Sequence, residues 1–456
     1  MIFLGIDAGT QGVRATAADE NGKLIASAHR QYEHFNLASE EMIQKGYKEQ
    51  SPEEWWDACR QVLKEIRDDI VKNADNASCP VAAVCIDGTS GTIVPLDEND
   101  APLGNAIMYN DIRGNGGKAL PKIEWCLING AGPDHRQAEK YVHHADYLVG
   151  KLSGEYEVTD WSNALKSGYD VRKEEWTSRS KAAFGTGLLK VVAPGTQIGE
   201  VNIRDGEIDY LNGAKLVAGA SDGYMSAVAT CAVNPGEWAS IIGTTLILKG
   251  VTTGFIDDPN GCVYCHKHPQ GYWMPGGASN VGGRCLNEWF GEDNFARLNA
   301  EAEKETPTGI LEYPLMVNGE RFPFLDANYP GFGDHKNYTA VIEGIAFVER
   351  LCFEELERLG CEVGDTIYST GGACKSDIWL QIRADVLGKT IKIPELTDAA
   401  IGGAMLAAGS VYYSSLSEAV SHMGRIARTV KPQKRIYEDI YKHFKEQVEL
   451  TKKVKL

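Results

Sequence analysis

The sequence has little positive charge and no long apolar run. Its 46 Lys and Arg residues are outnumbered by 63 Asp and Glu residues, which gives a formal net charge of -17. Nucleic acids and anionic membranes bind concentrated basic surface, so we expect neither as a partner. No apolar stretch is long enough to span a bilayer, and the N-terminal residues MIFLGIDAGT contain neither a basic stretch nor a cleavable apolar segment. These absences predict a soluble, cytoplasmic protein.

The chain also lacks a cysteine framework. Its 11 cysteines are odd in number and scattered over 456 residues, which is typical of reduced thiols in a cytosolic protein. The densest cluster, residues 262–268 (CVYCHKH), contains residue types that bind zinc. The alternation of apolar residues around it favours a strand, which would turn Cys262 and Cys265 to opposite faces, and no second ligand cluster has zinc-finger spacing. We therefore expect no metal in this segment.

The length and a recurring pattern predict two domains. A chain of 456 residues, 43% of them hydrophobic, is too long for one ordinary core. Residues 2–31 are typical of three antiparallel strands joined by turns, and a helix follows with Pro52 at its first position. The pattern of apolar strand, turn and apolar strand returns at residues 238–248 (WASIIGTTLIL). We place the boundary in the polar turn at 233–236 and predict domains of residues 1–234 and 235–456.

The turn after the first apolar strand has the chemistry of an anion site. Asp7 is followed by Ala8-Gly9-Thr10-Gln11-Gly12. Successive backbone N–H groups in such a glycine-containing turn form a concavity that binds anions. A carboxylate beside it can hold magnesium, usually through waters. An ordinary β-hairpin with an aspartate has the same residues, so the motif alone leaves both interpretations open.

Three later segments extend this chemistry. Residues 243–245 (GTT) form a similar turn without a carboxylate, and residues 369–377 (STGGACKSD) lie between a predicted strand and a predicted helix. The glycines of the second segment could lie under a planar base, or Ser376 or Asp377 could simply cap the helix. Asp222 ends an apolar strand and opens a helix. It could act as a general base on a hydroxyl, cap the helix, or do both.

Taken in order from Gly5 to about Ala408, these segments resemble the FGGY family of carbohydrate kinases. The resemblance lies in GIDAGTQGVRA, in IIGTTLIL, and in GGACKSDIWLQIRADVLGKTIKIPE followed by DAAIGGAMLAAG. It implies an α/β fold of two actin-like ATPase (ribonuclease H-like) domains, each with a mixed central sheet, and a cleft between them. The N-terminal domain would hold the sugar and the first phosphate hairpin, and the C-terminal domain would bind ATP.

The resemblance also assigns roles to particular residues. Asp222 would be the catalytic base and a substrate contact, and Asp7 would organise magnesium. The ATP-binding residues would be Thr10, Gln11, Arg14, Gly243, Thr244, Thr245, Gly371, Gly372, Ala373 and Ser376. The substrate-binding residues would be Thr89, Ser90, Asn110, Asp111 and Arg113. Tyr109 stands where the family more usually has tryptophan, which bears on the subfamily and not on the family.

The enzyme implied is an ATP- and magnesium-dependent kinase of a small carbohydrate. The segments GTSGT, MYNDIRG and GYWMPGGASNVGG are most similar to ribulokinase-like members, so a ketopentose is expected, D-ribulose ahead of D-xylulose. Kinases of glycerol or gluconate share the scaffold and stay open as alternatives. A further alternative is an actin-like ATP switch that phosphorylates no sugar. The sequence determines neither the hydroxyl that is attacked nor whether a homodimer forms.

Overall fold

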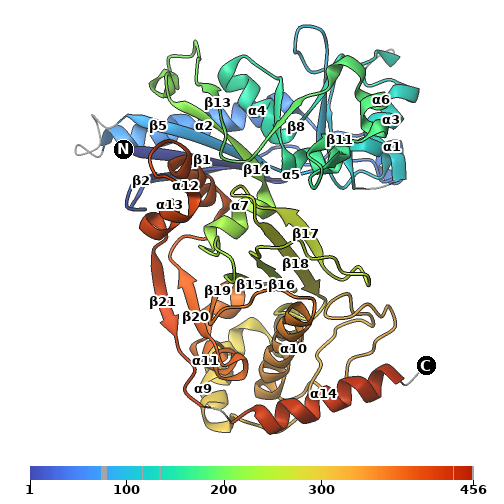
Figure 1. Ribbon diagram of the computed structural model, residues 1–456, viewed down its shortest axis with the longest axis vertical. Helices are drawn as coiled ribbons and strands as arrows, with labels where there is room; N and C mark the ends of the chain where they lie inside the picture. The colour runs from blue at the N-terminus through green and yellow to red at the C-terminus, as the bar shows by residue number, and fades with distance from the viewer. Residues whose placement is uncertain (73–79, 116, 133–134, 435, 454–456) are drawn as a thin grey trace. The chain divides into compact units, whose positions relative to one another are not determined.

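The computed structural model describes residues 1–72, 80–115, 117–132, 135–434 and 436–453. The chain forms two compact units (Figure 1): unit 1 is Met1–Ala229 with Leu396–Gly424, and unit 2 is Thr230–Glu395 with Arg425–Leu456. The predicted boundary at 234 and 235 lies close to the first crossing between the units. Residues 396–424, which the prediction assigned to the second domain, belong to unit 1. In the part of the chain that is described, no helix is both long and apolar enough to cross a membrane.

Unit 1 is built on a mixed six-stranded sheet. Its strands lie in the order β13 (Gln197–Glu200), β14 (Lys215–Ser221), β5 (Val81–Gly88), β1 (Ile2–Ala8), β2 (Gly12–Asp19) and β3 (Leu24–Gln31). The antiparallel meander β1–β2–β3 confirms the prediction for residues 2–31. Strands β1, β5 and β14 are parallel, so their carboxyl ends meet at one edge of the sheet.

Helices cover both faces of this sheet. On one face, α2 (Pro52–Lys72) and α4 (His144–Ser153) pack their apolar side chains against Leu4 and Ile6. The other face of β1 contacts α12 (Ala399–Val411), which also packs on α7 (Asp222–Ala229). The approach of α12 is close, because a Cβ added to Gly5 would lie 1.8 Å from the carbonyl oxygen of Ala400. This packing of small residues places segment 396–424 in unit 1.

Smaller elements complete unit 1 around the carboxyl edge of its sheet. A four-stranded sheet has the order β4 (Glu49–Gln50), β7 (Ala106–Ile107), β6 (Ile93–Leu96) and β8 (Lys140–His143). Two-stranded pairs join β9 (Val158–Asp160) to β12 (Lys190–Val192) and β10 (Tyr169–Asp170) to β11 (Glu175–Trp176). The remaining α-helices are α1 (Glu40–Gln44), α3 (Ala119–Asn129), α5 (Trp161–Ala164), α6 (Ser178–Phe184) and α13 (Leu416–Met423).

Unit 2 repeats the topology of unit 1. Its sheet has the order β17 (Tyr264–Lys267), β18 (Trp273–Ser279), β16 (Leu246–Gly250), β15 (Trp238–Ile242), β19 (Thr366–Thr370), β20 (Thr390–Pro394) and β21 (Ile426–Val430). From β18 to β21 the strands pair antiparallel, antiparallel, parallel, parallel and antiparallel, as they do from β3 to β13 in unit 1. The helices are α8 (Arg284–Phe290), α9 (Phe295–Glu305), α10 (Tyr338–Arg358), α11 (Asp377–Leu387) and α14 (Glu438–Lys453).

Candidate active site

Asp222 lies where strand β14 ends and helix α7 begins. Its Oδ1 accepts a hydrogen bond of 2.7 Å from the backbone N–H of Gly223. The backbone N–H of Ser221, the residue before Asp222, donates to Ser162 Oγ at 2.8 Å, and the Ser162 hydroxyl donates to Asp160. These bonds fix the backbone on which Asp222 stands. Its side chain is partly exposed, so a substrate hydroxyl can reach it.

A second aspartate faces Asp7 across the parallel strands, and sequence reasoning missed it. Asp7 and Asp87 are register partners near the ends of β1 and β5. The Asp87 carboxyl is completely buried, and apart from the neighbouring Asp7 carboxyl its oxygens have no hydrogen-bond partner among the described residues. Burial raises the pKa of Asp87 well above its usual range, and the negative charges of Asp7, Asp222 and Asp398 raise it further. This environment favours the protonated form of Asp87.

The pKa of Asp7 is raised as well. Burial is the main cause, and the charges of Asp222 and Asp398 add to it, while Arg14 opposes them. Asp398 caps helix α12, where its Oδ1 accepts from Ile401 N–H and from Thr16 Oγ1, each at 3.1 Å. The edge of the sheet thus gathers acidic groups whose mutual repulsion a divalent cation would offset.

The residues present fit magnesium in the way that kinases use it. Within the described ranges, no three His, Cys, Asp or Glu side chains converge to hold a metal ion by themselves. Magnesium is commonly bound by one or two carboxylates, several waters and substrate phosphates. Asp7, at the end of a strand and beside a glycine-containing turn, can supply such a carboxylate.

The turn between β1 and β2 is held in place by hydrogen bonds from inside and from outside the hairpin. Gly9 N–H donates to the carbonyl oxygen of Gly12 at 2.9 Å. The buried amide of Gln50 donates to the carbonyl oxygen of Thr10 at 2.9 Å. The side chains of Gln11 and Arg14 are exposed, and that of Thr10 is half-buried. The predicted phosphate-binding residues of unit 1 are therefore ordered and accessible.

Unit 2 contains a cavity of about 570 Å³ that is lined by half of the predicted ATP-binding residues. They are Gly243, Thr244, Gly372, Ala373 and Ser376. The cavity is walled by apolar and aromatic side chains, among them Phe295 and Trp379. Gly371, which directly precedes this wall, has φ of +95°. A Cβ there would lie 2.4 Å from the carbonyl oxygen of Ile242, so the turn after β19 requires glycine.

Several polar side chains of this cavity were not predicted, among them Arg284, Asn287, Glu292, Lys375 and Asn299. Asn299, on helix α9, accepts hydrogen bonds at its Oδ1 from Ser376 Oγ at 2.9 Å and from Tyr338 OH at 2.8 Å. Ser376 also caps α11 by accepting from Trp379 N–H, so its hydroxyl proton is free to point at Asn299. The Asn299 amide is thereby oriented with its NH2 group as a remaining donor. The sequence ARLNAEAEKE gives no signal for this role, because it reads as a plain amphipathic helix.

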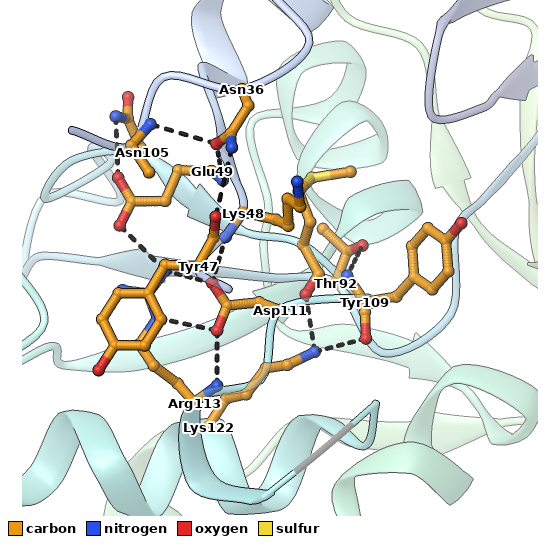
Figure 2. Close-up of polar contacts among 12 residues, drawn as sticks. Asn36, Tyr47, Lys48, Glu49, Thr92, Asn105, Tyr109, Asp111, Arg113 and Lys122 are labelled. Carbon is orange, nitrogen blue, oxygen red and sulfur yellow. Dashed lines mark hydrogen bonds and ion pairs between the residues drawn. The ribbon is translucent and has the colours of Figure 1, made fainter. Parts of the chain in front are cut away.

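In unit 1, hydrogen bonds and ion pairs hold the loops that were predicted to bind the sugar (Figure 2). Asp111 is fully buried and forms a bidentate ion pair with Arg113, at 3.0 Å to Nε and 2.7 Å to Nη2. Thr89 is also buried, and its hydroxyl contacts Thr92 Oγ1 and His144 Nδ1. Direct sugar contacts by Thr89, Asp111 and Arg113 do not fit these geometries. Ser90 and Asn110 are accessible, and among the described residues neither side chain has a hydrogen-bond partner.

A cation that sequence reasoning missed lies near Asp222. Lys166 follows helix α5, is partly buried, and has no hydrogen bond or ion pair within the described ranges. Burial lowers the pKa of Lys166, the positive charge of Lys118 lowers it further, and the charge of Asp222 opposes both. An ammonium group in this position can attract an anionic group of a ligand.

The cysteine–histidine segment packs as part of the unit 2 core. Cys262 precedes strand β17 and Cys265 lies within it, and both pack half-buried against the core. Burial raises the pKa of both thiols, which disfavours the thiolate form that metals bind. That the segment holds no zinc stays a prediction.

Comparison with known proteins places this architecture in one family. The profile of the N-terminal domain of the FGGY family of carbohydrate kinases matches residues 2–117, and that of the C-terminal domain matches residues 239–411. The chain therefore belongs to the FGGY family of carbohydrate kinases, which confirms the resemblance seen in the sequence.

Relatives with different names share this likeness. A xylulose kinase of Bacillus subtilis is 26% identical over 97% of this chain and 97% of its own length. A gluconokinase of Bacillus licheniformis is 26% identical over 89% of this chain and 86% of its own length. A solved glycerol kinase of Plasmodium falciparum with ADP has a TM-score of 0.81 at 17% identity, covering 100% of this chain and 99% of that one. The last likeness confirms the predicted two-domain actin-like fold.

Proposed function

We propose that this kinase transfers the terminal phosphoryl group of ATP to a hydroxyl of a neutral ketopentose, D-ribulose ahead of D-xylulose, with Asp222 as general base. The observation that carries the proposal is the position of Asp222, partly exposed at a fixed strand-to-helix junction beside the acidic edge that contains Asp7. A base in this position can accept the proton of a hydroxyl as its oxygen attacks phosphorus. ADP is the leaving group.

Each unit, taken by itself, offers groups that suit part of a nucleotide. In unit 2, the cavity beside Gly372 and Ala373 suits a purine, and the donor NH2 of Asn299 suits a ring nitrogen of adenine. In unit 1, the hairpin of Thr10 and Gln11 suits phosphate oxygens. Magnesium bound near Asp7 would neutralise phosphate charge. The chain's own part is to position the groups and to accept the proton.

The sugar loops favour a neutral substrate. Lys118, at the end of the second loop, is exposed. Arg113 lies in that loop and Lys122 reaches it from helix α3, and both are buried with protein partners. Neither charge is available to pair with a substrate carboxylate. The accessible groups, Ser90 and Asn110, are uncharged and suit sugar hydroxyls.

A panel of ketopentoses, polyols and sugar acids, assayed by ADP release at fixed ATP, tests the proposal. We expect the highest kcat/KM with D-ribulose and lower values with D-xylulose, glycerol and gluconate. A higher kcat/KM with glycerol or gluconate than with every ketopentose would refute the substrate assignment. Steady ATP turnover that is independent of any carbohydrate would instead favour an ATP switch.

One observation supports a second candidate, a kinase of sugar acids. The unpaired ammonium of Lys166 lies near Asp222, where it could bind a substrate carboxylate or the phosphoryl group in transfer. Lys166→Met separates these cases. Loss of turnover with gluconate alone would support the sugar-acid kinase, whereas an equal loss with every substrate would assign Lys166 to the phosphoryl group.

A further inference from the structure

The two loops that flank the proposed sugar site are joined by one buried lysine. Lys122, on helix α3, is completely buried, although its side chain carries an ammonium group. Its Nζ donates to the carbonyl oxygens of Gly91 at 3.0 Å, Met108 at 2.7 Å and Tyr109 at 3.0 Å. Figure 2 shows the Lys122 side chain reaching the loop of Tyr109 from below. An ammonium has three protons, so these bonds use its whole donor capacity.

The acceptors belong to different loops. Gly91 lies in the turn after β5, next to Ser90, whereas Met108 and Tyr109 follow β7 and directly precede Asn110. A further bond joins the same loops, because Tyr109 N–H donates to Thr92 Oγ1 at 3.0 Å. The spacing between Ser90 and Asn110 is therefore fixed through Lys122 and Thr92.

The buried Asp111 carboxylate fixes the far side of the second loop. Its Oδ1 accepts from Arg113 N at 2.8 Å and Arg113 Nε at 3.0 Å, and its Oδ2 accepts from Lys48 N at 2.6 Å and Arg113 Nη2 at 2.7 Å. Two carboxylate oxygens offer about four acceptor sites, so this carboxylate is saturated by the protein. It has no acceptor left for a sugar hydroxyl.

Arg113 is also held by several partners. Its guanidinium also pairs with Glu49 at 3.0 Å and lies over the rings of Tyr47, at 4.6 Å, and Trp125, at 5.3 Å. Burying a pair of charges costs desolvation energy that is recovered only when hydrogen bonds satisfy both partners. A buried polar network whose donors and acceptors are satisfied in this way is typical of side chains that stabilise one loop conformation.

We propose that Lys122 and the ion pair of Asp111 with Arg113 are positioning residues, which hold Ser90 and Asn110 at the spacing that binds the sugar. The inference rests on the proposed function and changes the role of Asp111, which acts on the substrate through the loop and not by direct contact. Misplacing a binding group by about 1 Å can cost on the order of 100-fold in rate. Loss of these positioning residues should therefore lower the efficiency with which the sugar is used.

Lys122→Met tests the proposal, because methionine keeps the volume and removes every donor. We expect the KM for the sugar to rise about 10- to 100-fold, with the KM for ATP changed less than about twofold. Lys181→Met, an exposed lysine of α6 in the same unit, is the control and should match the wild type. An unchanged sugar KM would overturn the proposal. A fall in kcat with both KM values unchanged would also overturn it, since that result reports only a smaller folded fraction.

Two additions keep the test decisive. Thr92→Val is isosteric and removes the acceptor for Tyr109 N–H, so it should raise the sugar KM in the same direction by a smaller factor, even if Lys122→Met folds poorly. Hydrogen exchange of residues 88–92 and 107–113 should accelerate in both variants and not in Lys181→Met. If the wild type phosphorylates no sugar, the proposed function fails. Hydrogen exchange alone then tests whether Lys122 and Thr92 hold the two loops, and unchanged exchange in both loops would overturn that proposal.

Discussion

Replacing Asp222 with asparagine separates proton transfer from helix capping. Asparagine keeps the oxygen that accepts from Gly223 N–H at 2.7 Å, but its amide cannot take a proton at neutral pH. A positioned base typically contributes about 100- to 10,000-fold to a rate. That range corresponds to about 2.7 to 5.5 kcal/mol of transition-state stabilisation. We therefore expect kcat at saturating sugar and ATP to fall by about 100- to 10,000-fold.

The stability of the variant should stay close to that of the wild type. Losing a negative charge at the N-terminus of α7 costs about 0.3 to 1 kcal/mol. The same change relieves repulsion with Asp7, whose pKa the Asp222 charge raises. These effects oppose each other. ADP release and a thermal unfolding curve on the same preparation check both expectations, and retention of more than about a tenth of wild-type kcat would show that Asp222 is only a cap.

Three further expectations follow from contacts within the individual units. Asn299→Ala should raise the KM for ATP about tenfold, as one lost hydrogen bond of about 1 to 1.5 kcal/mol would, and leave the KM for the sugar unchanged in steady-state kinetics. Burial raises the pKa of Asp146 to about 7. The folded state therefore keeps the Asp146 proton up to a higher pH than the unfolded state does. The stability that protonated Asp146 contributes is full below about pH 4 and is lost as the pH rises through 7. The unfolding midpoint of the wild type should accordingly fall relative to Asp146→Asn between these pH values, and parallel curves would contradict this reasoning. Gly5→Ala should destabilise the protein by about 1 to 3 kcal/mol through overpacking against α12, whereas Gly206→Ala, which has open space around its Cβ, should change the midpoint little.

Local sequence rules predicted the elements whose determinants are local. The meander of β1, β2 and β3 follows from apolar alternation and turn residues, and α2 begins at Pro52 as expected. Ser376 caps α11, which was one of the two interpretations of its segment. The motif order also identified the family, because its segments are spaced along most of the chain.

Roles that depend on distant partners could not be predicted in this way. No local pattern singles out Asp87, because its significance comes from the Asp7 carboxylate beside it in the parallel register. No local pattern singles out Lys122 either, and only the fold shows that three carbonyl oxygens surround its ammonium. Segment 396–424 joins unit 1 because its glycines allow α12 to approach the sheet, for example at Gly403, where a Cβ would lie 3.3 Å from the Cα of Gly5.

Transfer of a phosphoryl group from ATP to a sugar hydroxyl can be followed with a label. The protein is incubated with D-ribulose and ATP labelled in its γ-phosphate, and the products are analysed by mass spectrometry. We predict a labelled pentose monophosphate that forms in a one-to-one ratio with ADP, and that forms at least about 100-fold more slowly with Asp222→Asn. Labelled inorganic phosphate in place of the sugar phosphate, released equally with and without sugar across the panel, would contradict the account.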